Sequence, residues 1–145
     1  MKRNNDYIWG SEYDWPACDK YGYIGIFLTA GGSYAPLSCI NNLKIFDLVL
    51  KYISKLPQMN CYSTIKSSKD PSSFFTKGCF IYDGDFNGGP YSLEVKPSML
   101  LHIDMIDPVI KSILKVNCFR SISFHEINQI TKSTIIEDIE YAYCE

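Results

Sequence analysis

The sequence predicts an α+β fold, a single domain in which a mainly antiparallel sheet packs against two or three helices. Helical and strand-like patterns alternate along the chain without the strict β-α-β regularity of parallel sheets. One pair of short strand-like runs also flanks a glycine-rich turn, as in a hairpin. The 145 residues match the common size of one domain and show no linker or internal repeat, so we expect residues 1–145 to form a single unit.

The first half of the chain contains one clear strand and one clear helix. Residues 23–29 form a β-branched and aromatic run bracketed by glycines, which is typical of a buried inner strand. Residues 41–57 predict an amphipathic helix, because an asparagine can cap its start and Pro57 ends it. Its expected buried stripe consists of Phe46, Val49, Leu50, Ile53 and Leu56.

The second half begins with a short helix predicted through Phe75, entered at Asp70-Pro71. The runs 78–85 and 90–95 then predict a hairpin with a longer loop. Asp107 as cap and Pro108 at the first helical position predict a second clear helix. We expect its buried side to comprise Val109, Ile110, Ile113 and Leu114.

The last third of the chain is less regular. Residues 118–126 alternate apolar side chains with serines, which favours a half-buried strand. Residues 133–145 fit two patterns equally, because Ser133 could cap an amphipathic helix while Ile139, Tyr141 and Tyr143 alternate as in a strand. The sequence predicts either a helix or a strand for this segment.

Charge is distributed unevenly, although the net charge is only −2. The segments 6–19, 78–95 and 133–145 contain eleven of the sixteen acidic residues and no lysine or arginine. The strongly basic patch that marks nucleic-acid binding proteins is missing, so we expect no nucleic-acid partner. If the acidic segments share one face, that face would attract a basic protein. Ordinary solvated surface explains the same pattern.

No targeting or membrane-spanning segment is predicted. The start is basic but lacks the continuous apolar stretch of a signal peptide, and no later apolar run reaches the length of a membrane span. Because the cysteines are separated by at least 18 residues, they form neither a C-x-x-C motif nor a compact disulfide framework. We therefore expect a cytoplasmic protein with mostly buried thiols and no membrane partner. The six cysteines are Cys18, Cys39, Cys61, Cys79, Cys118 and Cys144.

Residues 83–94, DGDFNGGPYSLE, match the calcium-loop pattern of EF-hands. The matching positions are Asp83, Asp85, Asn87, Gly88 and Glu94. An EF-hand loop lies between two helices, whereas the residues before Asp83 are strand-like and Pro97 follows shortly after the loop. We therefore expect a hairpin turn stabilised by its own Asp and Asn side chains, and we expect no cofactor. A calcium-modulated binding module remains an alternative.

Catalytic motifs are sparse. No G-x-S-x-G, P-loop, G-x-G-x-x-G or H-E-x-x-H sequence occurs. A small hydrolase would need a cysteine beside a histidine, and Cys79 with His102 or Cys118 with His125 are the pairs the chain offers. Because neither pair stands in a nucleophile-elbow or protease-like context, we expect no enzyme and keep the hydrolase as an alternative.

Two blocks of the sequence resemble a group of small bacterial proteins found beside toxin genes. The first is Trp15-Pro16, with Asp19 and Gly22, running into an apolar strand and a Thr29-Ala30-Gly31 turn. The second, PYSLEVKPSMLLHIDMID, covers residues 90–107. The resemblance implies an immunity protein of a contact-dependent growth inhibition or related polymorphic toxin system. Such a protein binds its cognate toxin domain, commonly a nuclease, and blocks its active site.

The hypothesis from the sequence is therefore a toxin-binding protein with an acidic and aromatic surface. Carboxylates would match a basic nuclease, and exposed aromatic side chains would provide contact area. Packing of Trp15 and Pro16 against the sheet edge is an equally good interpretation of the aromatic residues near the start. The candidate partner-binding residues are Asp14, Trp15, Asp83, Asp85, Phe86, Tyr91, Glu137, Asp138 and Glu140.

Overall fold

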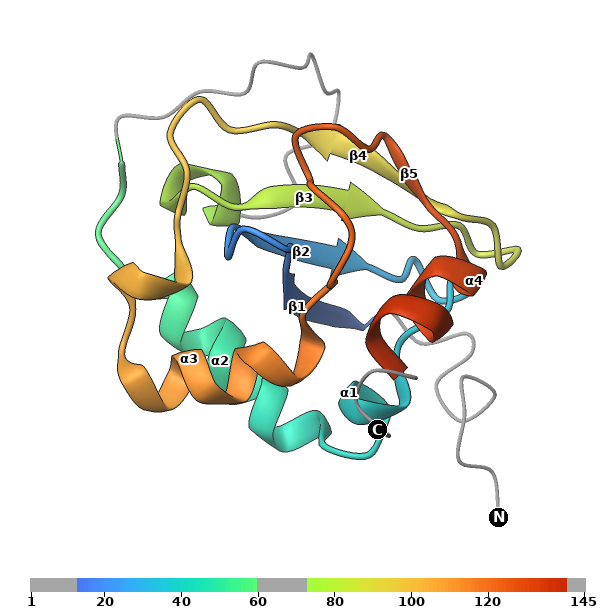
Figure 1. Cartoon of the computed structure of the whole chain (residues 1–145), viewed down its shortest axis with the longest axis horizontal. Helices are drawn as coiled ribbons and strands as arrows, with labels where there is room; N and C mark the ends of the chain where they lie inside the picture. Colours follow the sequence, from blue (N-terminus) through green and yellow to red (C-terminus); the bar gives the residue numbers. More distant parts are fainter. Residues whose placement is uncertain (1–12, 60–72, 141–145) are drawn as a thin grey trace.

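A computed structural model describes residues 13–59 and 73–140, and the strands in this part of the chain form one curled sheet (Figure 1). The strands lie side by side in chain order: β1 (Asp14–Cys18), β2 (Ile24–Leu28), β3 (Phe80–Asp83), β4 (Tyr91–Val95) and β5 (Gln129–Ile130). β2 and β3 are parallel, and the other neighbouring pairs are antiparallel. The prediction of a single α+β domain with a mainly antiparallel sheet is confirmed.

The helices are short apart from α2. They are α1 (Leu37–Ile40), α2 (Leu43–Ser54), α3 (Pro108–Leu114) and α4 (Lys132–Ile135). 3₁₀ turns form at η2 (Ser73–Lys77), η3 (Ile103–Met105) and η4 (Lys115–Asn117), and a π-helical turn, η5 (Ile136–Glu140), continues α4. In Figure 1, α2 and α3 run beside each other below β1, and α4 lies at the right-hand end of the sheet. None of the helices in the described ranges is long and apolar enough to span a membrane.

The two helices expected most clearly from the sequence both form. α2 buries Phe46, Val49 and Ile53 of the predicted stripe, while Leu50 and Leu56 are half-buried. Asn42 stands at its start as expected, but its side chain makes no capping hydrogen bond. In α3, the Asp107 carboxylate accepts hydrogen bonds from the backbone N–H groups of Val109 and Ile110, at 2.8 and 3.4 Å, so the predicted cap is confirmed. The expectation that Val109 is buried is wrong, since its side chain is 67% exposed.

The exposure of Val109 has a physical cause in how α3 is anchored. The Asp107 backbone N–H donates to the hydroxyl of the half-buried Tyr52 on α2, which anchors the start of α3 to that helix. Burial increases along the helix, because Ile110 and Ile113 are half-buried against the core and Leu114 is completely buried. A helix of seven residues therefore tilts from surface to core, and a periodic apolar pattern alone does not reveal that tilt.

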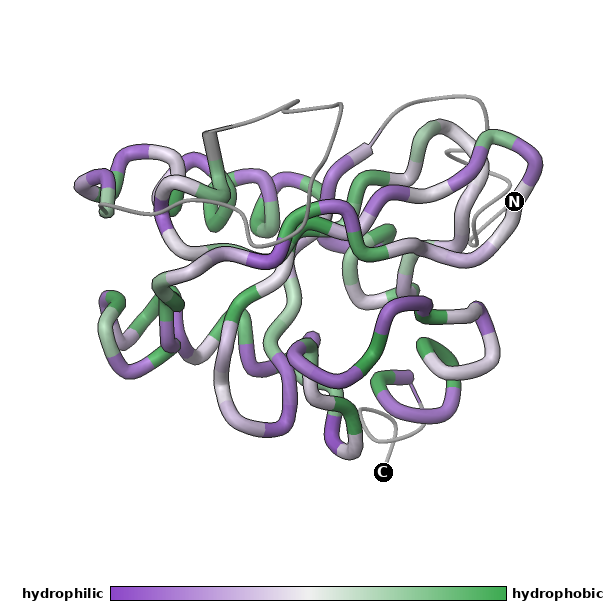
Figure 2. Tube along the Cα trace, turned by 90° about the horizontal axis from the view of Figure 1, so that it is seen from above, coloured by the Kyte–Doolittle hydropathy of each residue, from purple (hydrophilic) through white to green (hydrophobic). Residues whose placement is uncertain are grey.

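One face of the sheet is built from stacked aromatic rings. The strand register aligns Trp15 with Phe27 and Phe27 with Tyr82, and the ring centroids lie 4.3 and 5.0 Å apart. The irregular segment that contains Phe119 and Phe124 covers this face. Figure 2 shows the apolar residues gathered along the central strands, while many of the outer loops are polar.

The strand predicted for residues 118–126 does not form. Cys118 makes an isolated parallel bridge with Cys18, and the chain then turns. The buried Asp19 carboxylate explains the turn, because it accepts the backbone N–H of Phe124 at 2.9 Å and those of Tyr21 and Tyr23 at 3.0 Å. These bonds tie the backbone of 118–126 to the β1–β2 turn and not to a neighbouring strand.

The hairpin, the inner strand and the C-terminal segment also compare closely with the sequence predictions. β3 and β4 form the predicted hairpin, and β2 is an inner strand as expected. The helical alternative holds for residues 132–140, although Thr131 caps the helix and not Ser133. Phe75 lies in η2, whereas Asp70, Pro71 and residues 141–145 lie outside the described residues.

Candidate functional site

The loop between β3 and β4 is fixed by a single buried serine. The Ser33 hydroxyl accepts the backbone N–H of Asp85 at 2.6 Å and donates to the carbonyl oxygen of Gly89 at 2.8 Å. Ser33 belongs to the segment that follows β2 and is only 2% exposed. Its hydroxyl therefore joins both sides of the loop to the core of the domain.

Close backbone contact adds to this attachment. A Cβ atom placed on Gly32 would lie 1.9 Å from the carbonyl oxygen of Phe86, so only glycine fits there. The backbone N–H of Gly84 also donates to the carbonyl oxygen of Leu28 at 2.7 Å. The Gly31-Gly32 pair was visible in the sequence as a loop signal, but its contact with a loop more than fifty residues away was not.

The loop residues that match the calcium pattern form a turn between two strands. The Asp85 carboxylate accepts the backbone N–H of Asn87 at 2.9 Å, and Gly88 adopts a φ of 88°. Glu94 lies within β4, which carries it away from the turn. Among the described residues, no group of three or more His, Cys, Asp or Glu side chains is placed to hold a metal ion. These contacts correspond to the expected hairpin turn and not to an EF-hand.

Asp14 and Asp83 lie at the same end of the sheet as this loop. The register pairs Asp14 with Leu28 on β2, and Leu28 in turn with Asp83 on β3. The two acidic positions are therefore separated by two strand spacings, about 10 Å. We name Asp14, Asp83, Asp85 and Phe86 the strand-end surface. Asp85 is exposed and Phe86 is 51% exposed, while Asp14 and Asp83 are half-buried.

Two of the predicted partner-binding residues belong to the core. Trp15 and Tyr91 are 0% and 1% exposed, so neither is available to a partner. The Trp15 indole donates to the Tyr91 hydroxyl at 3.0 Å, and that hydroxyl donates to the carbonyl oxygen of Tyr34 at 2.7 Å. Successive residues of a strand point to opposite faces, so Asp14 and Trp15 cannot share one surface. Packing of Trp15 against the sheet is the correct alternative.

The acidic residues of the C-terminal helix differ in their surroundings. Glu140 accepts hydrogen bonds from the Tyr34 hydroxyl at 2.6 Å and the Leu37 backbone N–H at 2.9 Å, which holds η5 against the segment before α1. Asp138 accepts from the backbone and hydroxyl of Ser121. Glu137 is exposed. Burial, together with the hydrogen bond to Glu140, raises the pKa of the Tyr34 phenol. Two of the three carboxylates, Asp138 and Glu140, thus have structural roles.

Within residues 13–59 and 73–140, the contacts of His102, His125 and Cys118 do not pair a thiol with a histidine. His102 caps η3, because its Nδ1 accepts the Asp104 backbone N–H at 3.0 Å, while Nε2 lies 2.5 Å from the carbonyl oxygen of Tyr21. Both ring nitrogens are thereby engaged. The Cys118 thiol interacts with Cys18 and with the carbonyl oxygen of Asp19, and not with His125. His125 instead packs edge-on against Tyr23 and Phe80.

The arrangement of the described residues gives a fixed acidic and aromatic loop at one end of the sheet and no assembled catalytic group. Comparisons with models of known protein families, with curated proteins and with solved structures find no match for this chain. The geometry of the strand-end surface is therefore the main basis for a functional proposal.

Proposed function

We propose that this chain is an immunity protein that binds and neutralises a cognate toxin domain through its strand-end surface, without catalysis of its own. The observation that carries the proposal is the loop 84–90, which presents Asp85 and Phe86 to solvent while Ser33 fixes its backbone. The sequence resemblance to immunity proteins supports the same role.

A fixed loop suits the recognition of a protein. Binding loses less conformational entropy when the contacting segment is already ordered in the free protein. The half-exposed ring of Phe86 offers an apolar anchor, since aromatic side chains are enriched at the core of interfaces. The loop therefore combines an anchor with a preformed backbone.

The charge of the surface favours a basic partner. Asp14, Asp83 and Asp85 lie at one end of the sheet, and residues 78–95 include no lysine or arginine. Carboxylates in such an arrangement accelerate association with a basic protein and discriminate against acidic ones. A nuclease toxin is the partner class we propose, because its phosphate-binding groups are basic and the carboxylates would take the place of the phosphates. The inhibitor would then block substrate entry.

The experiment is a protection assay in living bacteria. The product of the adjacent gene is expressed as the candidate toxin together with the wild-type chain, with Asp85→Lys or with Glu126→Lys. We expect the wild type and Glu126→Lys to restore growth and Asp85→Lys to lose most of the protection. Glu126 is the matched control because it is an exposed acidic residue next to His125, whose carbonyl oxygen accepts from Lys96 at the far end of β4.

Two outcomes would contradict the proposal. Growth that stays inhibited in the presence of folded wild-type chain would remove the immunity function. Equal protection by Asp85→Lys and Glu126→Lys would keep that function but move the binding surface away from the loop. Circular dichroism of each purified variant confirms that the comparison is made between folded proteins.

A further inference from the structure

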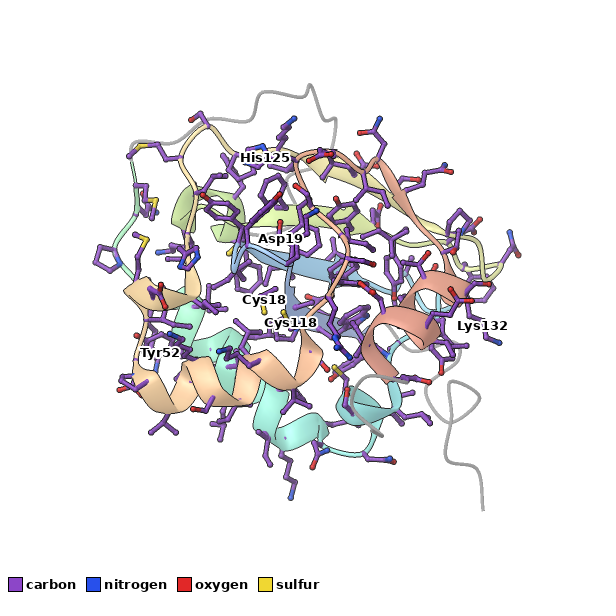
Figure 3. All side chains as sticks on the ribbon, viewed as in Figure 1. Cys18, Asp19, Tyr52, Cys118, His125 and Lys132 are labelled. Atoms are coloured by element: carbon purple, nitrogen blue, oxygen red, sulfur yellow. The ribbon has the colours of Figure 1, made fainter. Side chains whose placement is uncertain are left out.

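Cys18 and Cys118 are brought together although one hundred residues separate them in the sequence. Cys18 ends β1, and Cys118 pairs with it in an isolated parallel bridge, where the backbone N–H of Phe119 donates to the Cys18 carbonyl oxygen at 2.8 Å. Residues paired across such a bridge point to the same side, with Cα atoms about 5 Å apart. That separation lies within the range that a disulfide spans. Figure 3 shows the two labelled side chains next to each other.

The two thiols differ in access and in acidity. Cys18 is completely buried, whereas Cys118 is partly exposed. A hydrogen bond between the thiols lowers the pKa of Cys118, and the same bond together with burial raises the pKa of Cys18. The positive charge of Lys115 also lowers the pKa of Cys118. The accessible sulfur is thus also the one that more readily becomes a thiolate, which is the nucleophilic form.

We propose that Cys118 is a thiol modification site which reacts with low-molecular-weight disulfides, such as oxidised glutathione, and passes the bond on to Cys18. The product is an intramolecular disulfide between the end of β1 and the segment that covers the aromatic face of the sheet. The cysteine pair is separate from the strand-end surface, because Cys18 and Asp14 lie at opposite ends of β1.

The reaction is two successive thiol–disulfide exchanges. The Cys118 thiolate attacks one sulfur of oxidised glutathione, a mixed disulfide forms at Cys118, and the first glutathione leaves as a thiolate that takes up a proton. Cys18 then loses its proton and attacks the Cys118 sulfur, which releases the second glutathione. The two protein thiols are oxidised by two electrons, and one glutathione disulfide is reduced to two thiols.

The chain offers a direct assay, because trypsin separates the two cysteines from all others. Fragments 4–20 and 116–120 each contain one cysteine, Cys18 and Cys118 respectively. The full-length protein is incubated in its native state with oxidised glutathione, treated with iodoacetamide, digested and analysed by mass spectrometry. We expect the two fragments to be joined by a disulfide. Cys39 is completely buried and serves as the internal control, because it should carry neither glutathione nor a disulfide bond.

Two variants separate the steps. Cys18→Ser retains a hydroxyl donor toward Cys118 but cannot complete the exchange, so glutathione should remain attached to fragment 116–120. Cys118→Ser should leave Cys18 unmodified, because the buried thiol has no direct access to the oxidant. Wild-type protein that retains glutathione on Cys118, or that joins Cys118 to a cysteine other than Cys18, would overturn the proposal. A Cys118 recovered only as the iodoacetamide product would do the same.

Discussion

Gly32 allows the close backbone contact that, together with the Ser33 hydrogen bonds, sets the position of the candidate surface. A methyl group at this position would lie 1.9 Å from the Phe86 carbonyl oxygen and 2.6 Å from that of Asp85. We expect Gly32→Ala to push the loop away from Ser33, to lower the free energy of unfolding by about 1–3 kcal/mol as overpacking does, and to weaken partner binding. Urea denaturation and a binding titration measure the two effects.

Gly88 is the matched control, because it lies in the same loop but needs glycine for another reason. Its φ is 88°, and the nearest atom to an added Cβ is 3.8 Å away, so there is space but an unusual backbone conformation. Asparagine tolerates such a conformation. Gly88→Asn should therefore preserve binding and cost less stability than Gly32→Ala, with the remaining cost due to backbone strain at the positive φ. Similar losses in Gly32→Ala and Gly88→Asn would show that close packing is not the cause.

Tyr82 gives a pH-dependent prediction at the same scale. Burial and the nearby Asp19 raise the pKa of its phenol, which is completely buried and donates to the Ile127 carbonyl oxygen at 2.7 Å. The unfolded phenol has a pKa of about 10, so above that pH the unfolded chain loses a proton that the folded chain keeps. The stabilisation from the buried Tyr82 phenol is therefore fully present below pH 10, and the free energy of unfolding falls as the pH rises further.

The variant Tyr82→Phe tests this assignment. It should cost about 1–3 kcal/mol at pH 7, because the Ile127 carbonyl oxygen loses its buried donor. Its stability should also decline less steeply than that of the wild type above pH 10, since one raised pKa has been removed. Urea midpoints from pH 7 to pH 11 measure both. Parallel curves for the two proteins would assign the alkaline loss to other groups.

At the scale of elements, α3 depends on its cap. Asp107 accepts two backbone N–H groups at the start of the helix, and its own N–H donates to Tyr52 on α2. Asp107→Ala should lower the free energy of unfolding by about 1 kcal/mol, the usual cost of losing a cap. Asp107→Asn should restore most of it, because the side-chain oxygen is retained. An alanine variant as stable as the wild type in urea would show that the cap contributes nothing.

Elements with a local signal could be predicted from the sequence. α2 and α3 have a cap or a stop and a periodic apolar stripe, and the β3–β4 hairpin has glycines between two strand-like runs. The strand predicted for residues 118–126 does not form, because the backbone there is bound by Asp19, a carboxylate about one hundred residues away in the sequence. Ile122 and Phe124 are buried as expected, but Ser123 between them is buried too, so the predicted alternation does not hold.

In the candidate site too, features with a local sequence signal could be predicted, and features that depend on distant contacts could not. The loop 84–90, with its exposed Asp85 and Phe86, followed from turn-forming residues and charge. The burial of Trp15 and Tyr91 could not be predicted, because it depends on the stacking of β1, β2 and β3 in register and on a hydrogen bond between distant strands. The role of Ser33 also required the fold, since a serine beside two glycines is ordinary in any loop.

At the scale of the whole molecule, the proposed function depends on how the acidic residues are distributed in space. The fold brings Asp14 to the same strand end as Asp83 and Asp85. It uses Asp138 and Glu140 to hold the C-terminal helix against the rest of the domain. The strand-end surface therefore stands out by grouping three carboxylates at one end of the sheet, one exposed and two half-buried. Other exposed carboxylates are spread over the rest of the described residues: Asp47, Asp104, Asp107, Glu126 and Glu137.

The most direct test of this account is a calorimetric titration of the purified toxin domain into the wild-type chain and into the double variant Asp83→Lys and Asp85→Lys. We predict that the double variant binds at least about tenfold more weakly, a loss of about 1.4 kcal/mol or more. The association rate of the wild type should also fall as salt is added. An unchanged affinity in the double variant, with its fold intact, would contradict the account.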